Sequence, residues 1–179
     1  MANPNNPFGF RIARHRGGGC VQHADYTQAD SLAASIFTGD PIKETGVGKN
    51  ITVAEADSAV AVGVFLGCSY TEADGGHRFS QHWLTGTTGT EIEVQAVSDS
   101  NITYYIQTDT LTEDEIGKKC DWDDGAGDPK FGTSGRILLA SAASPTTGAV
   151  KILGLADIPG NEYGDHAIAE VKFVVSEML

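Results

Sequence analysis

Positive charge is scarce in this chain of 179 residues, which has 12 lysines and arginines against 24 aspartates and glutamates. The formal net charge is −12. A body this acidic repels the phosphates of nucleic acids and the surface of anionic membranes, so we expect neither as a partner. The only formally charged residues in the first 16 positions are three cations, Arg11, Arg14 and Arg16.

Cysteine is also rare, and long apolar runs are missing. Cys20, Cys68 and Cys120 lie about fifty residues apart without a C-x-x-C pair, which fits neither a disulfide framework nor a zinc site. We therefore expect three ordinary thiols in a protein made in a reducing cytosol. The longest apolar run, Ala59–Leu66, is far too short to cross a bilayer, and the start MANPNNPFGF lacks the apolar segment of a secretory signal.

Helix signals are few, whereas strand signals recur from about residue 40 onward. Thr90–Ser98 and Ile102–Thr108 alternate apolar and polar residues with the period of two that is typical of half-buried strands. Because only the polar loop Asp99–Asn101 separates them, we predict that they form a hairpin. Ala59–Tyr70 is apolar at nearly every position, which predicts a strand buried on both faces. Further strands are predicted at Arg136–Ala140, Ala149–Leu155 and His166–Val175.

One short helix is predicted, because Thr112 and Glu115 have the spacing of a capping box and Gly117 stops the helix soon afterwards. Short strands with glycine-rich turns are typical of an antiparallel β-barrel or sandwich. The predicted fold class is therefore all-β, with one short helix and an extended N-terminal arm.

Residues 1–35 are predicted to be an extended N-terminal arm and connector, and residues 36–179 a β-rich body. Asn-Pro repeats disfavour helix at the start, and the glycine run 17–19 is typical of a hinge. Such an arm is suited to adhesion, because guanidinium groups pair with carboxylates of a neighbour while aromatic rings enter its grooves. The predicted docking residues are Phe8, Phe10, Arg11, Arg14 and Arg16. We expect deletion of residues 1–16 to remove binding and to leave the body folded.

No catalytic, metal or cofactor site is predicted. The acidic loop 120–129 holds oxygen ligands of the kind that calcium takes, but it lacks the glycine and the glutamate of an EF-hand. A solvated acidic loop is the preferred interpretation, and calcium binding through its aspartates is the alternative. Those aspartates are Asp121, Asp123, Asp124 and Asp128.

Two further patterns bear on possible chemistry. GVGKN, residues 46–50, resembles part of a phosphate-binding loop, but Lys43 stands where the first glycine is required. We therefore predict a hairpin turn. No G-x-S-x-G nucleophile elbow is present, so the protein is not expected to be an enzyme. A hydrolase whose groups converge from distant strands stays an open alternative.

Four segments resemble one family of small tailed-phage virion proteins. The start PFGFRIARHRGGG, residues 7–19, is similar to the family's "PFGLRPVRH-G", and IFTGDPIKETG, residues 36–46, is similar to its "LF.GDPV..TG". EDEIGKKCDW, residues 113–122, resembles the element "DIGK.ad". The end ILGLADIPGNEYGDHAIAEVKFVVSEML, residues 152–179, resembles "ILGL...P.NE.GDYA...V.IN.H", with Val174-Val175-Ser176 in place of the Asn-x-His tail. The segments follow the family's order along nearly the whole chain.

The resemblance implies a capsid decoration or cement protein. Such proteins sit outside a shell of HK97-type major capsid protein and clamp neighbouring capsomers, often as trimers. The expected partners are therefore the major capsid protein and further copies of this chain, and the expected location is the exterior of the virion capsid. Self-association is predicted through a small-residue strand face with Ala61, Gly63 and Phe65.

A carbohydrate- or receptor-binding β module on a head or tail fibre is the alternative function. In that interpretation four aromatic residues form a platform on which sugar rings stack. These residues are Trp83, Trp122, Tyr104 and Tyr105.

Overall fold

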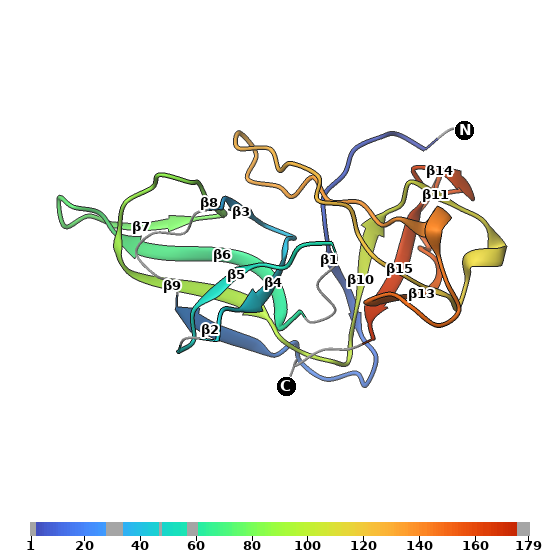
Figure 1. Ribbon diagram of the computed structural model, residues 1–179, viewed down its shortest axis with the longest axis horizontal. Helices are drawn as coiled ribbons and strands as arrows, with labels where there is room; N and C mark the ends of the chain where they lie inside the picture. Colours follow the sequence, from blue (N-terminus) through green and yellow to red (C-terminus); the bar gives the residue numbers. More distant parts are fainter. Residues whose placement is uncertain (1–2, 28–33, 47, 57–60, 175–179) are drawn as a thin grey trace.

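The computed structural model describes residues 3–27, 34–46, 48–56 and 61–174. Its sheets are antiparallel, and Figure 1 shows two groups of strands at opposite ends of an elongated molecule. The predicted all-β, antiparallel class is confirmed. The sheets form no closed barrel within the described ranges.

One end of the molecule is built on a five-stranded sheet in the order β1-β10-β15-β13-β12. Along the central strand β15, the predicted inward residues Ala169, Val171 and Phe173 are buried. β1 is an edge strand that pairs only with β10 in this sheet. The strands are β1 (Arg11–His15), β10 (Ile102–Gln107), β12 (Lys119–Cys120), β13 (Val150–Leu155) and β15 (Ile168–Phe173).

The other end is a six-stranded sheet in the order β2-β9-β6-β4-β5, with β7 also paired to β6. β6 is buried on both faces from Gly63 to Phe65, as predicted, but Leu66, Gly67 and Tyr70 are only half-buried. Residues 59 and 60 of the predicted strand lie outside the described ranges. A Cβ at Gly63 would lie 2.7 Å from the Val97 carbonyl oxygen, so the small residue lets the backbones approach. The strands are β2 (His23–Thr27), β4 (Pro41–Glu44), β5 (Ile51–Val53), β6 (Gly63–Thr71), β7 (His77–Ser80) and β9 (Thr90–Val97).

Smaller elements complete the fold. β3 (Ile36–Phe37) pairs with β8 (His82–Trp83), and β11 (Thr110–Leu111) pairs with β14 (Gly164–Asp165). β4 and β5 form a hairpin across residues 45–50, so the predicted turn at GVGKN is confirmed.

The predicted helix is a single 3₁₀ turn, η1 (Glu113–Glu115). Its capping box is present, because the Thr112 N–H donates to Glu115 Oε2 at 2.7 Å. Gly117 follows with a φ of +85°, which ends the turn before an α-helix can form. A second 3₁₀ turn, η2 (Ala140–Ala142), lies at the end of the long loop that follows β12.

The predicted hairpin between β9 and β10 is wrong. β9 lies between β2 and β6, whereas β10 lies between β1 and β15, so the link 98–101 crosses from one sheet to the other. The link is closed locally, because the Asn101 N–H donates to Asp99 Oδ1 at 2.8 Å and the Ile102 N–H donates to the Asp99 carbonyl at 3.2 Å. The same turn chemistry serves a hairpin or a crossing, and tertiary packing selects the strand partners.

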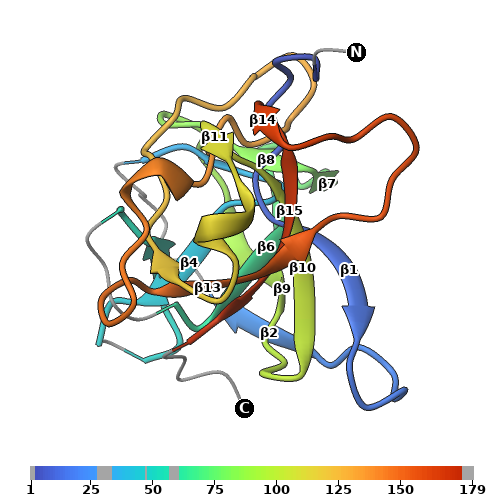
Figure 2. The same cartoon turned by 90° about the vertical axis from the view of Figure 1, so that its right-hand side faces the viewer.

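The N-terminal segment is part of both sheets and is not a separate extended arm. β1 pairs with β10 and β2 pairs with β9, which places the two strands in different sheets; Figure 2 shows β1 beside β10. The glycine run 17–19 lies in the connection between them, where the N–H groups of Gly17 and Gly19 donate to His15 Nδ1. The boundary predicted at residue 35 therefore does not separate an arm from a body among the described residues.

Two hydrophobic clusters form the core. The cluster under the five-stranded sheet includes Phe10, Tyr104, Trp122 and Phe173, and the cluster of the six-stranded sheet includes Trp83. Because Phe10 is only 2% exposed, deleting residues 1–16 would remove a core side chain together with strand β1. From the structure we therefore expect that deletion to destabilise the fold, in contrast to the expectation from the sequence.

Candidate docking surface

Phe10 anchors the N-terminal segment to the core. Its ring packs edge-on against Trp122 at 5.7 Å and Tyr104 at 6.1 Å between ring centroids, and it lies 4.9 Å from the ring of Phe173. Such aromatic contacts add to the free energy gained from burial. Phe10 thus packs inside its own chain and cannot enter a groove of a partner.

Two glycines fit the segment closely against its neighbours. Gly9 has a φ of +67°, and a Cβ there would lie 2.5 Å from Ser134 Cβ. Gly39 has a φ of +96°, and a Cβ there would lie 2.7 Å from the Phe8 carbonyl oxygen. The Phe10 N–H donates to the Gly39 carbonyl at 2.8 Å. Two of the segments on which the family resemblance rests, 7–19 and 36–46, are therefore packed together.

Residues 3–11 form a ridge, called here the N-terminal ridge, on the outside of this packing. Figure 1 shows it, in blue, running from the neighbourhood of β14 to the orange loop that follows β12. Arg11 is exposed and Phe8 is half-buried, and the Arg11 guanidinium lies 4.6 Å from the centroid of the Phe8 ring. This cation–π contact holds the guanidinium over the ring while leaving its N–H groups available to a partner.

A first groove, with a volume of about 320 Å³, lies between the N-terminal ridge and the segment 158–168. Apolar side chains and polar groups from the N-terminal ridge, from β10 and from the segment 158–168 face it. They include Phe8, Arg11, Gln107, Ile158, His166 and Ile168.

Side-chain amides hold the walls of the first groove together. Asn3 Nδ2 donates to the carbonyl oxygens of Glu162 and Asp165 at 2.8 and 3.1 Å. Gln107 Nε2 donates to the Pro4 carbonyl at 2.8 Å and to the His166 carbonyl at 3.3 Å. Hydrogen bonds therefore link the N-terminal ridge to the segment 158–168. They hold the groove open in the chain on its own, without a partner.

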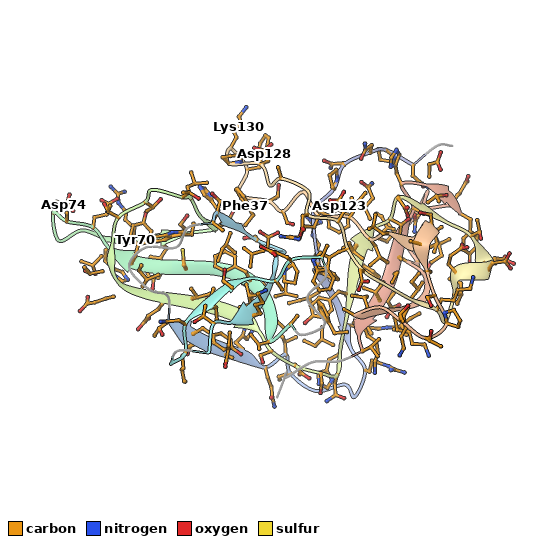
Figure 3. The ribbon with its side chains drawn as sticks, viewed as in Figure 1. Phe37, Tyr70, Asp74, Asp123, Asp128 and Lys130 are labelled. Atoms are coloured by element: carbon orange, nitrogen blue, oxygen red, sulfur yellow. The ribbon has the colours of Figure 1, made fainter. Side chains whose placement is uncertain are left out.

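A second groove, with a volume of about 500 Å³, lies on the other side of the N-terminal ridge, against the loop 126–135. Phe8 and Arg11 line both grooves. Phe131 is 63% exposed in the second groove, and Lys130 Nζ lies 5.2 Å from the centroid of its ring. Figure 3 shows Lys130 and Asp128 at the outer end of this loop. The N-terminal ridge and the loop 126–135 thus each present one aromatic–cation pair at the second groove.

The other predicted docking arginines have separate roles. Arg14 forms a two-pronged ion pair with Glu170, with N–O distances of 2.7 and 2.8 Å, and Thr103 Oγ1 donates to the same carboxylate at 2.7 Å. The hydrogen bonds from Arg14 to Glu170 and the charge of that carboxylate raise the pKa of Arg14. They fix the edge strand β1 to the sheet. Arg16 is exposed, and its backbone N–H donates to the Asn101 carbonyl at 2.9 Å.

An ion network centred on the buried Arg136 lies beside the loop 126–135. Arg136, 6% exposed, bonds Asp40 Oδ1 through Nε at 3.2 Å and also pairs with Asp124. Burial raises the pKa of Asp40, whereas hydrogen bonds from Ser134 and the Phe37 N–H, and the charge of Arg136, act in the opposite direction. The network joins the loop after β12 to the segment 36–46.

Three of the four aspartates of the acidic loop bind groups of the chain itself through their carboxylates. Asp121 Oδ1 accepts the Ala149 N–H at 2.8 Å, and Asp128 Oδ1 accepts the Lys130 N–H at 2.8 Å. Asp124 accepts the Ala56 N–H in addition to its pair with Arg136. In the part of the chain that the structure describes, no three His, Cys, Asp or Glu side chains lie together as metal ligands would.

The predicted self-association face is not a surface. Ala61 is 1% exposed and Phe65 0% exposed, and Gly63 is buried against the backbone of β9. That prediction is corrected, because these residues are covered within one copy of the chain. The stacking platform is corrected for the same reason, since Tyr104 and both tryptophans, Trp83 and Trp122, are buried and only Tyr105 is partly exposed.

The buried thiols are not poised for nucleophilic chemistry. Burial raises the pKa of Cys68 to about 11 and that of Cys120 to about 12, so both thiols stay protonated near neutral pH. Cys20 is exposed, and all three cysteines are free.

The two grooves present hydrogen-bonding and apolar groups, an arrangement suited to binding.

Sequence reasoning brought Phe8 and Arg11 to this surface but missed the groove walls. His166 and Gln107 lie far from the N terminus in sequence, and only the sheet order brings them to it. The alternation of Phe8, Phe10 and Ile12 with Gly9 and Arg11 is a strand signal that could have placed Phe10 in the core.

Comparison of the chain with protein-family models, with characterised proteins and with solved structures finds no match. None of the helices in the described ranges is long and apolar enough to span a membrane.

Proposed function

We propose that the protein is a structural virion protein, a decoration or cement protein that binds the outside of an HK97-type capsid and clamps neighbouring capsomers. The observation that carries the proposal is the meeting of the N-terminal segment and the segment 158–168 at the first groove. Phe8 and Arg11 come from the first segment of the family resemblance, and Pro159, Asn161 and His166 come from its last segment. Motifs that are far apart in sequence thus line one surface.

Charge supports the same proposal. The chain carries a net charge of −12, yet Arg11 lies exposed on the N-terminal ridge and Lys130 lies beside the second groove. A cationic spot on an acidic protein steers it to an acidic patch of a partner and selects the orientation of binding. In the proposal, each copy contacts the major capsid protein through this ridge, has no enzymatic activity, and associates as a trimer through a surface other than Ala61, Gly63 and Phe65.

Copy number on purified virus particles tests the proposal. We expect quantitative mass spectrometry to find this chain at an abundance approaching that of the major capsid protein. A fibre module would be scarce on the same particles. Absence of the chain from particles would overturn the proposal.

The surface is tested with a charge reversal and a matched control. Arg11→Glu is expected to lower the occupancy of this chain on particles that otherwise lack it. Arg78→Glu reverses an arginine on β7, at the far end of the molecule, and is expected to leave occupancy unchanged. Equal occupancy for the two variants would exclude the ridge as the contact.

A further inference from the structure

We propose that the first groove receives an acidic–apolar segment of the partner protein, in which one carboxylate binds Arg11 and an adjacent apolar side chain packs between Phe8 and Ile168. The inference rests on the proposed function for where the partner is found, and on the groove alone for its chemistry. It reverses the roles expected from the sequence, because the partner supplies the inserted side chain and this chain supplies the groove.

The charge argument comes from the arginines. Arg14, Arg78 and Arg136 each form an ion pair with a carboxylate of the chain. In the part of the chain that the structure describes, the Arg11 side chain instead contacts the Phe8 ring. A guanidinium held flat over a ring presents its N–H fork at the edge, which suits a two-pronged bond to a carboxylate. Arg11 is therefore a binding group that the fold leaves unused.

The shape argument comes from the rest of the groove. Phe8, Ile158 and Ile168 give it an apolar lining beside Arg11. A volume of about 320 Å³ is at the lower end of the range for ligand pockets. That space suits one apolar side chain with a neighbouring carboxylate rather than a folded domain. An extended peptide that lies along the N-terminal ridge places such a pair of side chains in the groove.

Gln107 adds a hydrogen-bonding signal. The residue is 2% exposed and lines the groove, and its Oε1 is buried without a hydrogen-bond partner. A buried acceptor left unpaired costs free energy, and a peptide N–H of the incoming segment supplies the missing donor. This acceptor favours a peptide over a simple carboxylate ion.

The groove also limits how acidic the segment is. Asp165 is exposed and precedes His166, which lines the groove. Its charge opposes a second carboxylate near the first. The matching sequence is therefore a single Asp or Glu beside an aliphatic or aromatic residue.

Short peptides test this chemistry on the full chain. The probe is acetyl-Asp-Leu-amide, and the matched probes are acetyl-Asn-Leu-amide, without the charge, and acetyl-Asp-Ser-amide, without the apolar side chain. Backbone NMR shifts of the ¹⁵N-labelled protein are followed during each titration. We expect the Asp-Leu probe to shift the amides of Phe8, Arg11 and Ile168 with a dissociation constant on the order of millimolar, and each matched probe to bind about tenfold more weakly.

Two variants assign the binding to the groove. Arg11→Gln is expected to weaken the Asp-Leu probe about tenfold, and Arg78→Gln is expected to leave its affinity unchanged. Equal binding of the Asn-Leu and Asp-Leu probes, or no shift at the groove amides, would overturn the inference.

The peptide titration and the particle measurement fail separately. If the Asp-Leu probe binds as expected but the chain is absent from particles, the groove chemistry stands and the proposed function fails. If the chain is abundant on particles and Arg11→Glu lowers its occupancy, but the probes do not discriminate, the proposed function stands and the acidic–apolar segment is excluded.

Discussion

The N-terminal ridge and the β6–β7 end of the molecule look alike in sequence and differ in structure. Each has a phenylalanine beside an arginine, Phe10-Arg11 in one and Arg78-Phe79 in the other. Phe10 is 2% exposed and Phe79 is 79% exposed. Arg78 is paired with Glu72 at 3.0 Å, whereas Arg11 lies over an aromatic ring. At the ridge the aromatic residue stabilises the fold and the cation is available for binding, and at the other end the aromatic is exposed and the cation is paired.

The largest test of this comparison is truncation of the two phenylalanines. Phe10→Ala removes a ring packed among three other aromatic side chains, and we expect it to lower the free energy of unfolding by about 3–5 kcal/mol. Phe79→Ala changes an exposed side chain and should stay within about 0.5 kcal/mol of the wild type. Urea unfolding measures both. Similar losses in the two variants would contradict the difference in burial.

The ion pair of the buried residues Arg136 and Asp40 gives the next effect. Arg136→Met leaves the Asp40 carboxylate buried without its cation, and we expect a loss of about 3 kcal/mol near pH 7. Arg78→Met, at the exposed end, is the matched control and should change the unfolding midpoint far less.

Acid should partly rescue the Arg136→Met variant. The folded pKa of Asp40 is already raised above its ordinary value of 3.8, and loss of the Arg136 charge raises it further. The folded state then binds the proton more tightly than the unfolded state, so the contribution of Asp40 to stability rises as pH falls through the folded pKa towards 3.8. Urea midpoints of the variant and the wild type should converge on acidification. A gap that widens at acid pH would show that Asp40 is not responsible.

Two glycines with positive φ give a smaller, matched effect. A Cβ at Gly9 would lie 2.6 Å from the Gly39 carbonyl oxygen, whereas a Cβ at Gly75, in the β6–β7 turn, meets nothing within 4 Å. Gly75→Ala is expected to cost about 1 kcal/mol from backbone strain alone. Gly9→Ala should cost about 1–3 kcal/mol more, because its neighbours are backbone and core atoms that cannot move away. Equal losses would mean that the ridge is less tightly packed than its geometry indicates.

Strand β9 and the link that follows it show what could be predicted from the sequence. Alternation along Thr90–Val97 correctly identified a strand with Ile92, Val94 and Ala96 inside, because period two follows from strand geometry alone. The partner of that strand was wrong, since the turn at Asp99 forms local hydrogen bonds that suit a hairpin and a crossing equally well. Local patterns specify elements, and long-range pairing specifies which elements meet.

The residues of the candidate site divide in the same way, into those that local sequence predicts and those that depend on long-range contacts. Arg11 stood out because it is a cation near the start of an acidic chain, and charge can be read residue by residue. Phe10 was misplaced, because its burial depends on contacts with Trp122 and Phe173, more than a hundred residues away. The groove walls could not be predicted for the same reason, since Gln107 reaches Pro4 only after β10 has paired with β15.

The smallest expected effect is the one on which the docking surface depends. Arg11→Gln removes a surface cation–π contact, and Arg78→Gln removes a surface ion pair with Glu72. Interactions of this kind contribute little to stability because water and salt screen exposed charges. We therefore expect no resolvable change in the urea midpoint of either variant. Any loss of peptide or particle binding in Arg11→Gln is then a direct effect on the first groove, whereas a midpoint shift in that variant alone would assign Arg11 a structural role and remove it from the docking surface.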